Sequence, residues 1–168
     1  GVHCLGGIYF VPRMYSGTPP GTPDSIALRA LQDDVTPVTE FCRALVRQFP
    51  FIRHWEVSNE PDASVFWCGR YKNYLAHDSS AIIGDYVDYL AAAHKGFKSA
   101  DPECTVLFGG LTAHSPEGHT WKPFWKTALE KGAGNYFDVG NIHYWSDLAA
   151  HRRIMRECGV PDRPFWLT

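Results

Sequence analysis

Short apolar runs alternate with segments of helical period along this chain, and that alternation constrains its fold more than any other feature. The runs predicted as strands are 7–11, 51–60, 105–108, 137–143 and 165–168. Alternating strands and helices form parallel sheets with right-handed crossovers. The sequence therefore predicts an α/β fold with five parallel strands.

The segments between these strands repeat apolar side chains at helical spacing. The predicted helices are 38–49, 82–97, 121–129 and 148–158. We expect Thr36 to cap the first helix, because Pro37 then falls in its first turn. Ser79 or Ser80 is expected to cap the second.

The strand that ends in Asn59-Glu60-Pro61 carries the main candidate for chemistry. Proline cannot continue a central ladder, so this strand should end near Glu60. A carboxylic acid at a strand's C-terminal tip can act as a general acid. The alternatives are a solvated or capping acid for Glu60 and a turn residue for Asn59.

The octapeptide 55–62 resembles the acid/base strand of clan A glycoside hydrolases, the retaining (β/α)8 enzymes, closest to families 39 and 5. Segments 138–145 and 164–168 resemble strands 6 and 7 of the same clan. The resemblance implies a partial (β/α)8 TIM barrel with five parallel strands, strands 3 to 7, and helices on one face. A whole barrel typically needs about 250 residues. Residues 1–168 are therefore expected to form a single incomplete catalytic barrel, with its N-terminal and C-terminal parts missing.

The same resemblance implies hydrolysis of O-glycosidic bonds in β-linked glycosides or polysaccharides by a retaining double displacement. Glu60 would be the acid/base, and Asn59 would bind the sugar hydroxyl beside the reacting carbon. The nucleophile would be a Glu just beyond Thr168, so the isolated chain is expected to be inactive.

Further substrate-binding residues are also implied. His143 and Tyr144, at the end of the predicted strand 137–143, would bind substrate or orient the nucleophile, with a hydrogen-bonded structural histidine as the alternative. Trp145 and, more weakly, Trp67 are possible sugar platforms, with simple packing as the alternative. Glu56 is predicted to be a buried supporting acid, because it lies roughly 13 Å along the strand from Glu60 at about 3.3 Å per residue.

Composition argues against several other functions. The formal charge of −2 comes with no basic stripe that would suggest nucleic acid, and no apolar run is long enough to span a membrane. The five cysteines form no CxxC pair, so neither a zinc site nor another cofactor is expected, and the cellular compartment stays open. His114, Glu117 and His119 are interpreted as a solvated loop.

Two rival interpretations remain at this point. One is a catalytically inactive carbohydrate-binding barrel, and the other is an unrelated open α/β domain in which Asn-Glu-Pro is accidental. Strand order separates the second from a barrel, because a doubly wound sheet reverses its order at a switch point.

Overall fold

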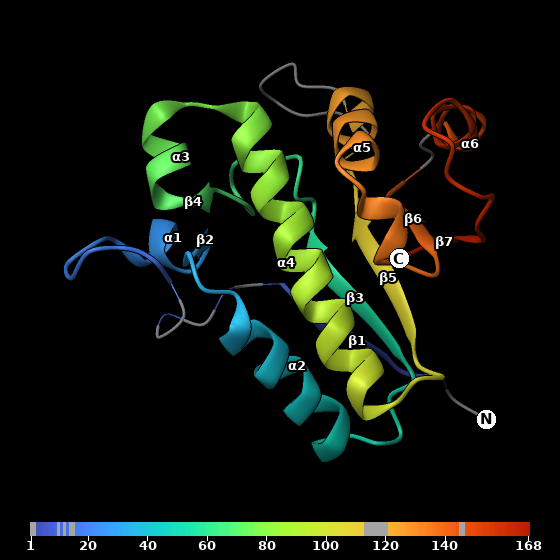
Figure 1. The fold of residues 1–168 in the computed structure, drawn as a ribbon, viewed down its shortest axis with the longest axis horizontal. Coiled ribbons are helices and arrows are strands. Elements are labelled where there is room, and N and C mark those ends of the chain that lie inside the picture. Colours follow the sequence, from blue (N-terminus) through green and yellow to red (C-terminus); the bar gives the residue numbers. More distant parts are fainter. Residues whose placement is uncertain (1–2, 10, 12, 14–15, 113–120, 145–146) are drawn as a thin grey trace.

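The computed structural model describes residues 3–9, 11, 13, 16–112, 121–144 and 147–168 (Figure 1). Its strands are β1 (Leu5–Ile8), β2 (Ala30–Leu31), β3 (His54–Asn59), β4 (Gly69–Arg70), β5 (Thr105–Gly110), β6 (Gly140–Ile142) and β7 (Phe165–Leu167). Its helices are α1 (Asp24–Ala27), α2 (Thr36–Gln48), α3 (Tyr71–Ala76), α4 (Ser79–Ala100), α5 (Trp121–Glu130) and α6 (Leu148–Glu157), with a 3-10 turn, η2 (Ala133–Asn135).

The main sheet is parallel and has three strands in the order β1-β3-β5. A second parallel pair joins β6 to β7. Single bridges from Leu107 to Val139 and from Leu111 to Ile142 connect β5 with the β6 segment. The strand order therefore follows the chain without the reversal of a doubly wound sheet.

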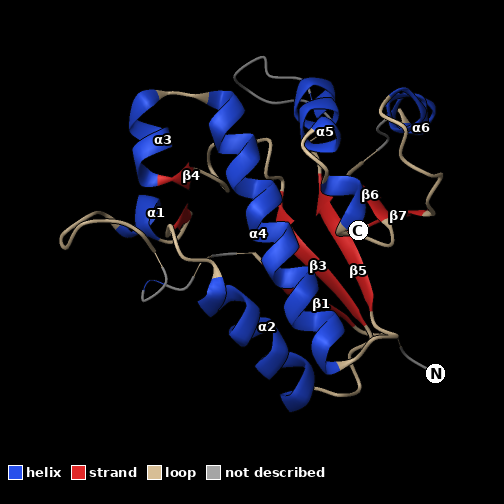
Figure 2. Ribbon diagram, in the orientation of Figure 1, coloured by secondary structure: helices blue, strands red, loops and turns tan. Residues whose placement is uncertain are grey.

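The predicted α/β class and the parallel pairing of the strands are confirmed. The prediction that five strands form one sheet is wrong. The hydrogen bonding is divided among three sheets, and the third is the short pair β2-β4. Helices α2, α4 and α5 lie on the same side of β1, β3 and β5, as Figures 1 and 2 show. A sheet covered on one side by helices fits a barrel wall, but closure into a barrel is not observed.

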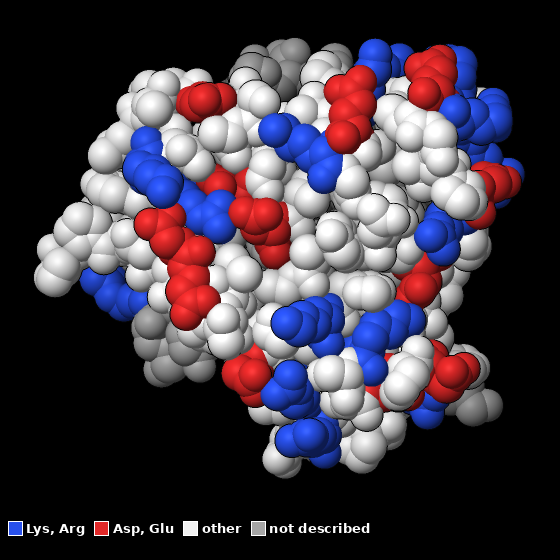
Figure 3. All heavy atoms as spheres, viewed as in Figure 1, with Lys and Arg blue, Asp and Glu red and all other residues white. Residues whose placement is uncertain are grey.

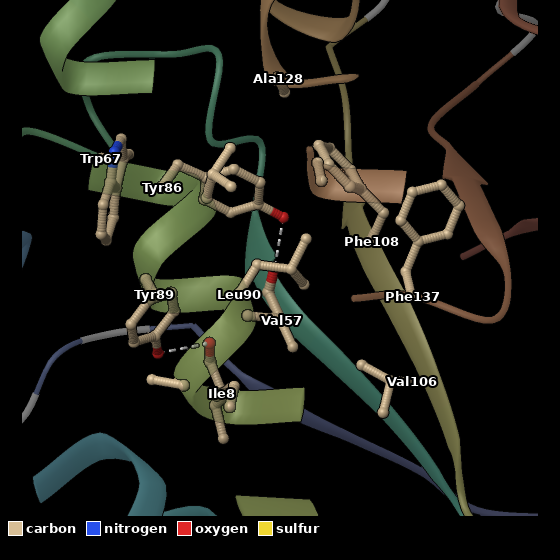
Figure 4. Close-up of a cluster of buried hydrophobic side chains, with 14 of the residues drawn as sticks. Ile8, Val57, Trp67, Tyr86, Tyr89, Leu90, Val106, Phe108, Ala128 and Phe137 are labelled. Atoms are coloured by element: carbon tan, nitrogen blue, oxygen red, sulfur yellow. Dashed lines mark hydrogen bonds between the residues drawn. The ribbon is translucent and has the colours of Figure 1, made fainter. Parts of the chain in front are cut away.

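The core lies between the main sheet and α4 (Figure 4). Trp55 of β3 stacks on Phe97 of α4, with ring centroids 5.0 Å apart. The buried Tyr86 hydroxyl donates to the Val57 carbonyl oxygen at 3.1 Å and accepts from the Gly109 backbone N–H at 2.9 Å. Because side chains alternate along a strand, the packing of Trp55 and Val57 against α4 directs Glu56 to the opposite face of the sheet.

The helix caps differ from the prediction. The α4 cap is Asp78, whose carboxylate accepts from the Ala81 backbone N–H at 3.0 Å. At α2, Thr36 is already helical, and its own N–H donates to the Asp34 carboxylate at 2.9 Å. An aspartate thus takes the role expected of a hydroxyl at α4, whereas at α2 the N-cap residue is Val35 and no described side chain caps the helix.

Ion pairs attach the short strand β4 to α4. The Arg70 guanidinium contacts the buried Asp85 and also Asp88, at 2.8 Å, both on α4. Lys72 pairs with Asp33 at 2.9 Å. Figure 3 shows basic and acidic side chains interspersed on this face. The pairs with Asp85 and Asp88 hold β4 beside α4.

Candidate active site

The candidate site lies where β3 ends, and the backbone there is strained. Four described non-glycine residues have positive φ. Three of them belong to this region, near the chain ends of β3 and β6, namely Ser58 (73°), Glu60 (44°) and Tyr144 (53°). Such conformations cost free energy and gather at functional sites. The Glu60 N–H donates to the Gly110 carbonyl oxygen at 2.9 Å, so the strained turn is fixed to β5.

Glu60 and His143 form the centre of the site. Glu60 Oε1 lies 2.9 Å from His143 Nδ1, although the two residues are 83 positions apart in the chain. Their side chains are 18% and 12% exposed, so the pair is partly desolvated yet open to solvent. The predicted convergence of these two residues is confirmed.

A glycine makes room for the imidazole. Gly110 ends β5 beside His143, and a Cβ atom built at this glycine would overlap the His143 ring. Residue 110 must therefore lack a side chain for His143 to reach Glu60.

Glu56 is buried behind this pair, with 1% of its surface exposed. Its carboxylate accepts from the Gly110 N–H at 3.1 Å, from Asn141 Nδ2 at 2.7 Å and from the Tyr9 hydroxyl at 3.5 Å. Burial raises the pKa of Glu56, while the Gly110 N–H and the charge of His143 oppose that rise. The predicted supporting acid is thus held by an amide, a hydroxyl and a backbone N–H.

Glu56 also contacts the site through His143. Its Oε1 is 4.0 Å from His143 Nε2, the ring nitrogen that faces away from Glu60. The backbone leaves the regular strand path at Ser58 and Glu60, and His143 comes from a different strand. One imidazole therefore lies between the two carboxylates.

An open cavity of about 600 Å³ adjoins Glu60. It is lined by Tyr9, Asn59, Glu60, Phe66, His143, Tyr144, Leu167 and Thr168. Tyr9 and Tyr144 are 42% and 70% exposed, so both rings are available to a ligand. Flat aromatic area beside hydrogen-bonding groups is the chemistry that binds a sugar ring.

The sequence predicted Asn59, Glu60, His143 and Tyr144 at this cavity but missed other lining residues. Tyr9 follows β1, which ends at Ile8, whereas the predicted strand ran over 7–11 and placed Tyr9 inside it. The true strand end would have marked this aromatic, because the carboxyl ends of parallel strands share one edge. Phe66 comes from the long loop after β3, and nothing in its local sequence marks it.

Trp67 is not at this cavity, so its interpretation as a sugar platform in this site is wrong. It is 4% exposed, and its indole N–H donates to the Ile82 carbonyl oxygen at 3.1 Å. Its ring packs against those of Tyr86 and Tyr89. The Trp67 side chain therefore packs the loop that follows β3 against α4. Trp145 lies outside the described residues.

A larger cavity, of about 860 Å³, lies beside the 61–68 loop, α4 and α5. Asp62 is among its lining residues, and its carboxylate accepts from the backbone N–H of Thr112 at 3.0 Å and from the Thr112 hydroxyl at 2.5 Å. Burial raises the pKa of Asp62. The Asp62 hydrogen bonds fasten the loop to the chain just after β5, which is a structural role. The smaller cavity is the better candidate, because the strained residues and the Glu60-His143 pair lie there.

Within the described parts of the chain, no three His, Cys, Asp or Glu side chains are grouped to hold a metal ion. His114, Glu117 and His119 fall outside those parts. The described helices include none that could cross a membrane. No protein-family model matches the chain, and no curated protein matches it either.

Proposed function

We propose that this chain is part of the catalytic barrel of a retaining glycoside hydrolase, with Glu60 as its acid/base. The observation that carries the proposal is the Glu60-His143 pair, with 2.9 Å between Oε1 and Nδ1, in an open cavity at the carboxyl edge of a parallel sheet. Catalytic groups of (β/α)8 enzymes occupy that edge. The unreversed strand order and the one-sided helices support the barrel assignment.

The residues around Glu60 have distinct roles in this mechanism. Glu60 gives its proton to the glycosidic oxygen as the bond to the leaving group breaks, and later takes a proton from the attacking water. The neighbouring Asn59 amide binds a sugar hydroxyl. Tyr9 and Tyr144 offer ring faces to the sugar, and His143 orients the Glu60 carboxyl.

A retaining reaction also needs a second carboxylate about 5–5.5 Å from the acid. Glu60 is the one acid among the described residues that line the cavity. Leu167 and Thr168, at the end of β7, line it as well. A residue that follows Thr168 in a longer protein would lie at this same edge, and we propose a Glu there as the nucleophile.

A second candidate function is carbohydrate binding without catalysis. It is favoured by the same observation, that one acid rather than two lines the cavity in the described residues. The aromatic and amide groups would then bind a sugar, and Glu60 would be a hydrogen-bonding group.

The test uses a longer protein that contains residues 1–168, assayed as wild type and as Glu60→Gln. With poor leaving groups, the Gln variant should lose about 10²–10⁴-fold in turnover, the usual contribution of general acid catalysis. With activated aryl glycosides the loss should be much smaller, because those leaving groups need little protonation. Asp62→Asn is the matched control, since it neutralises a neighbouring acid that does not line the smaller cavity. Equal losses on both substrate types would show that Glu60 is not the acid, and no turnover in the wild type would favour binding alone.

A further inference from the structure

The His143 imidazole is shared between two carboxylates in unequal ways. Nδ1 is 2.9 Å from Glu60 Oε1, which is hydrogen-bond distance, whereas Nε2 is 4.0 Å from Glu56 Oε1, which is a charge contact. Nδ1 can donate or accept in its hydrogen bond, depending on where the ring carries its protons. The group that faces Nε2 therefore influences whether Nδ1 donates a hydrogen bond to Glu60 or accepts one from it.

The partners of Glu56 indicate which form of its carboxyl faces the ring. The Gly110 backbone N–H and the Asn141 amide nitrogen donate to Oε1, and the Tyr9 hydroxyl reaches Oε2. Burial raises the pKa of Glu56, and the Gly110 N–H opposes that rise. An ionised carboxylate only accepts hydrogen bonds, and all three of these groups can donate one, so they favour the ionised form. A buried carboxylate 4.0 Å from Nε2 stabilises a proton on that nitrogen.

We propose that Glu56 is a positioning residue that keeps His143 Nε2 protonated, so that the Glu60-His143 pair retains its transferable proton between Nδ1 and Oε1. With Nε2–H fixed, that proton sits either on Glu60, donating to Nδ1, or on Nδ1, donating to Glu60. Without Glu56, Nε2 loses its proton, and the ring becomes a neutral donor through Nδ1 to an ionised Glu60. Such a Glu60 has no proton to give.

This inference rests on the proposed function only where it calls the shared proton catalytic. The proton position itself can be read from the 168-residue chain without any substrate. Nitrogen-15 NMR distinguishes protonated from unprotonated imidazole nitrogens, and the His143 signals are assigned by their disappearance in His143→Gln.

In the wild-type chain at neutral pH, we expect the His143 Nε2 signal in the protonated range. Glu56→Gln keeps the side-chain length and an oxygen acceptor for the Gly110 N–H but removes the charge, so Nε2 should move to the unprotonated range. Asp62→Asn should change the Nε2 signal much less, because the Asp62 carboxylate is held by Thr112 and, among the described residues, no hydrogen bond or ion pair joins it to His143.

An unprotonated Nε2 in the wild type would overturn the proposal, and that result does not depend on whether the Glu56→Gln variant folds. A protonated Nε2 in a folded Glu56→Gln chain would overturn it as well. Failure of the proposed function would look different. A longer protein without glycosidase activity would leave the Nε2 result unchanged, whereas an active enzyme with unprotonated Nε2 would refute only the role of Glu56.

Discussion

His151 is a buried histidine whose protonation should oppose folding. It is 0% exposed and lies in α6, where its ring stacks on Trp121 at a centroid distance of 3.6 Å. Nδ1 lies 3.0 Å from the Asp147 carbonyl oxygen, and Nε2 has no hydrogen-bond partner among the residues that the structure describes. Burial lowers the pKa of His151 from 6.5 to about 4.

The sign and size of the effect follow from that shift. A histidine whose pKa is lower in the folded state takes up its proton first in the unfolded chain, so stability is full above pH 6.5 and falls as the pH drops toward 4. One pKa unit corresponds to about 1.4 kcal/mol, so this group should cost roughly 2 kcal/mol between pH 7 and 4.5.

His151→Phe should remove this loss, because phenylalanine keeps an aromatic ring against Trp121 and does not titrate. Urea unfolding of both proteins at pH 7 and pH 4.5 measures the free energy of unfolding in each condition. Groups such as Glu56 and Asp62 titrate equally in both proteins, so they cancel in the comparison. If the two proteins lost the same stability between these pH values, the reasoning about His151 would be refuted.

Three further substitutions test the fold and the site. Gly110→Ala should force the His143 ring away and cost about 1–3 kcal/mol by overpacking; an unchanged His143 ring spectrum would contradict the close contact. Asp78→Ala should cost about 1 kcal/mol in urea unfolding through loss of the α4 cap, and Ser79→Ala much less, whereas equal costs would argue against Asp78 as the cap. Tyr86→Phe should cost about 1–3 kcal/mol, because its buried hydroxyl bonds both β3 and β5; a neutral effect would mean that those bonds do not hold α4 to the sheet.

Long periodic segments were predictable from the sequence, and short ones were not. Helices α2, α4, α5 and α6 were expected, because each repeats apolar residues over nine or more positions. The two-residue strands β2 and β4 and the six-residue helix α3 have too few residues to show a period. They depend on tertiary contacts, such as the ion pair between Arg70 and Asp85.

The site was predictable where a motif marks a strand end. Asn59 and Glu60 precede the proline that stops β3, and His143 follows β6, so the shared edge of parallel strands brought them together. The 4.0 Å contact between Glu56 and His143 was not predictable, because it joins side chains from β3 and from the end of β6, and no sequence pattern gives the distance between them. The role of Trp67 was predicted wrongly, because the sequence does not show whether an aromatic side chain in a loop packs into the core or faces a cavity.

The claim that the cavity beside Glu60 is the carbohydrate site can be tested most directly by NMR titration of the chain with neutral β-linked oligosaccharides. The account predicts that shifts will concentrate at the lining residues Asn59, Glu60, His143 and Tyr144. The amides around the larger cavity near Trp67 should stay unchanged. Shifts centred on the larger cavity, or none with any oligosaccharide in the series, would contradict the account.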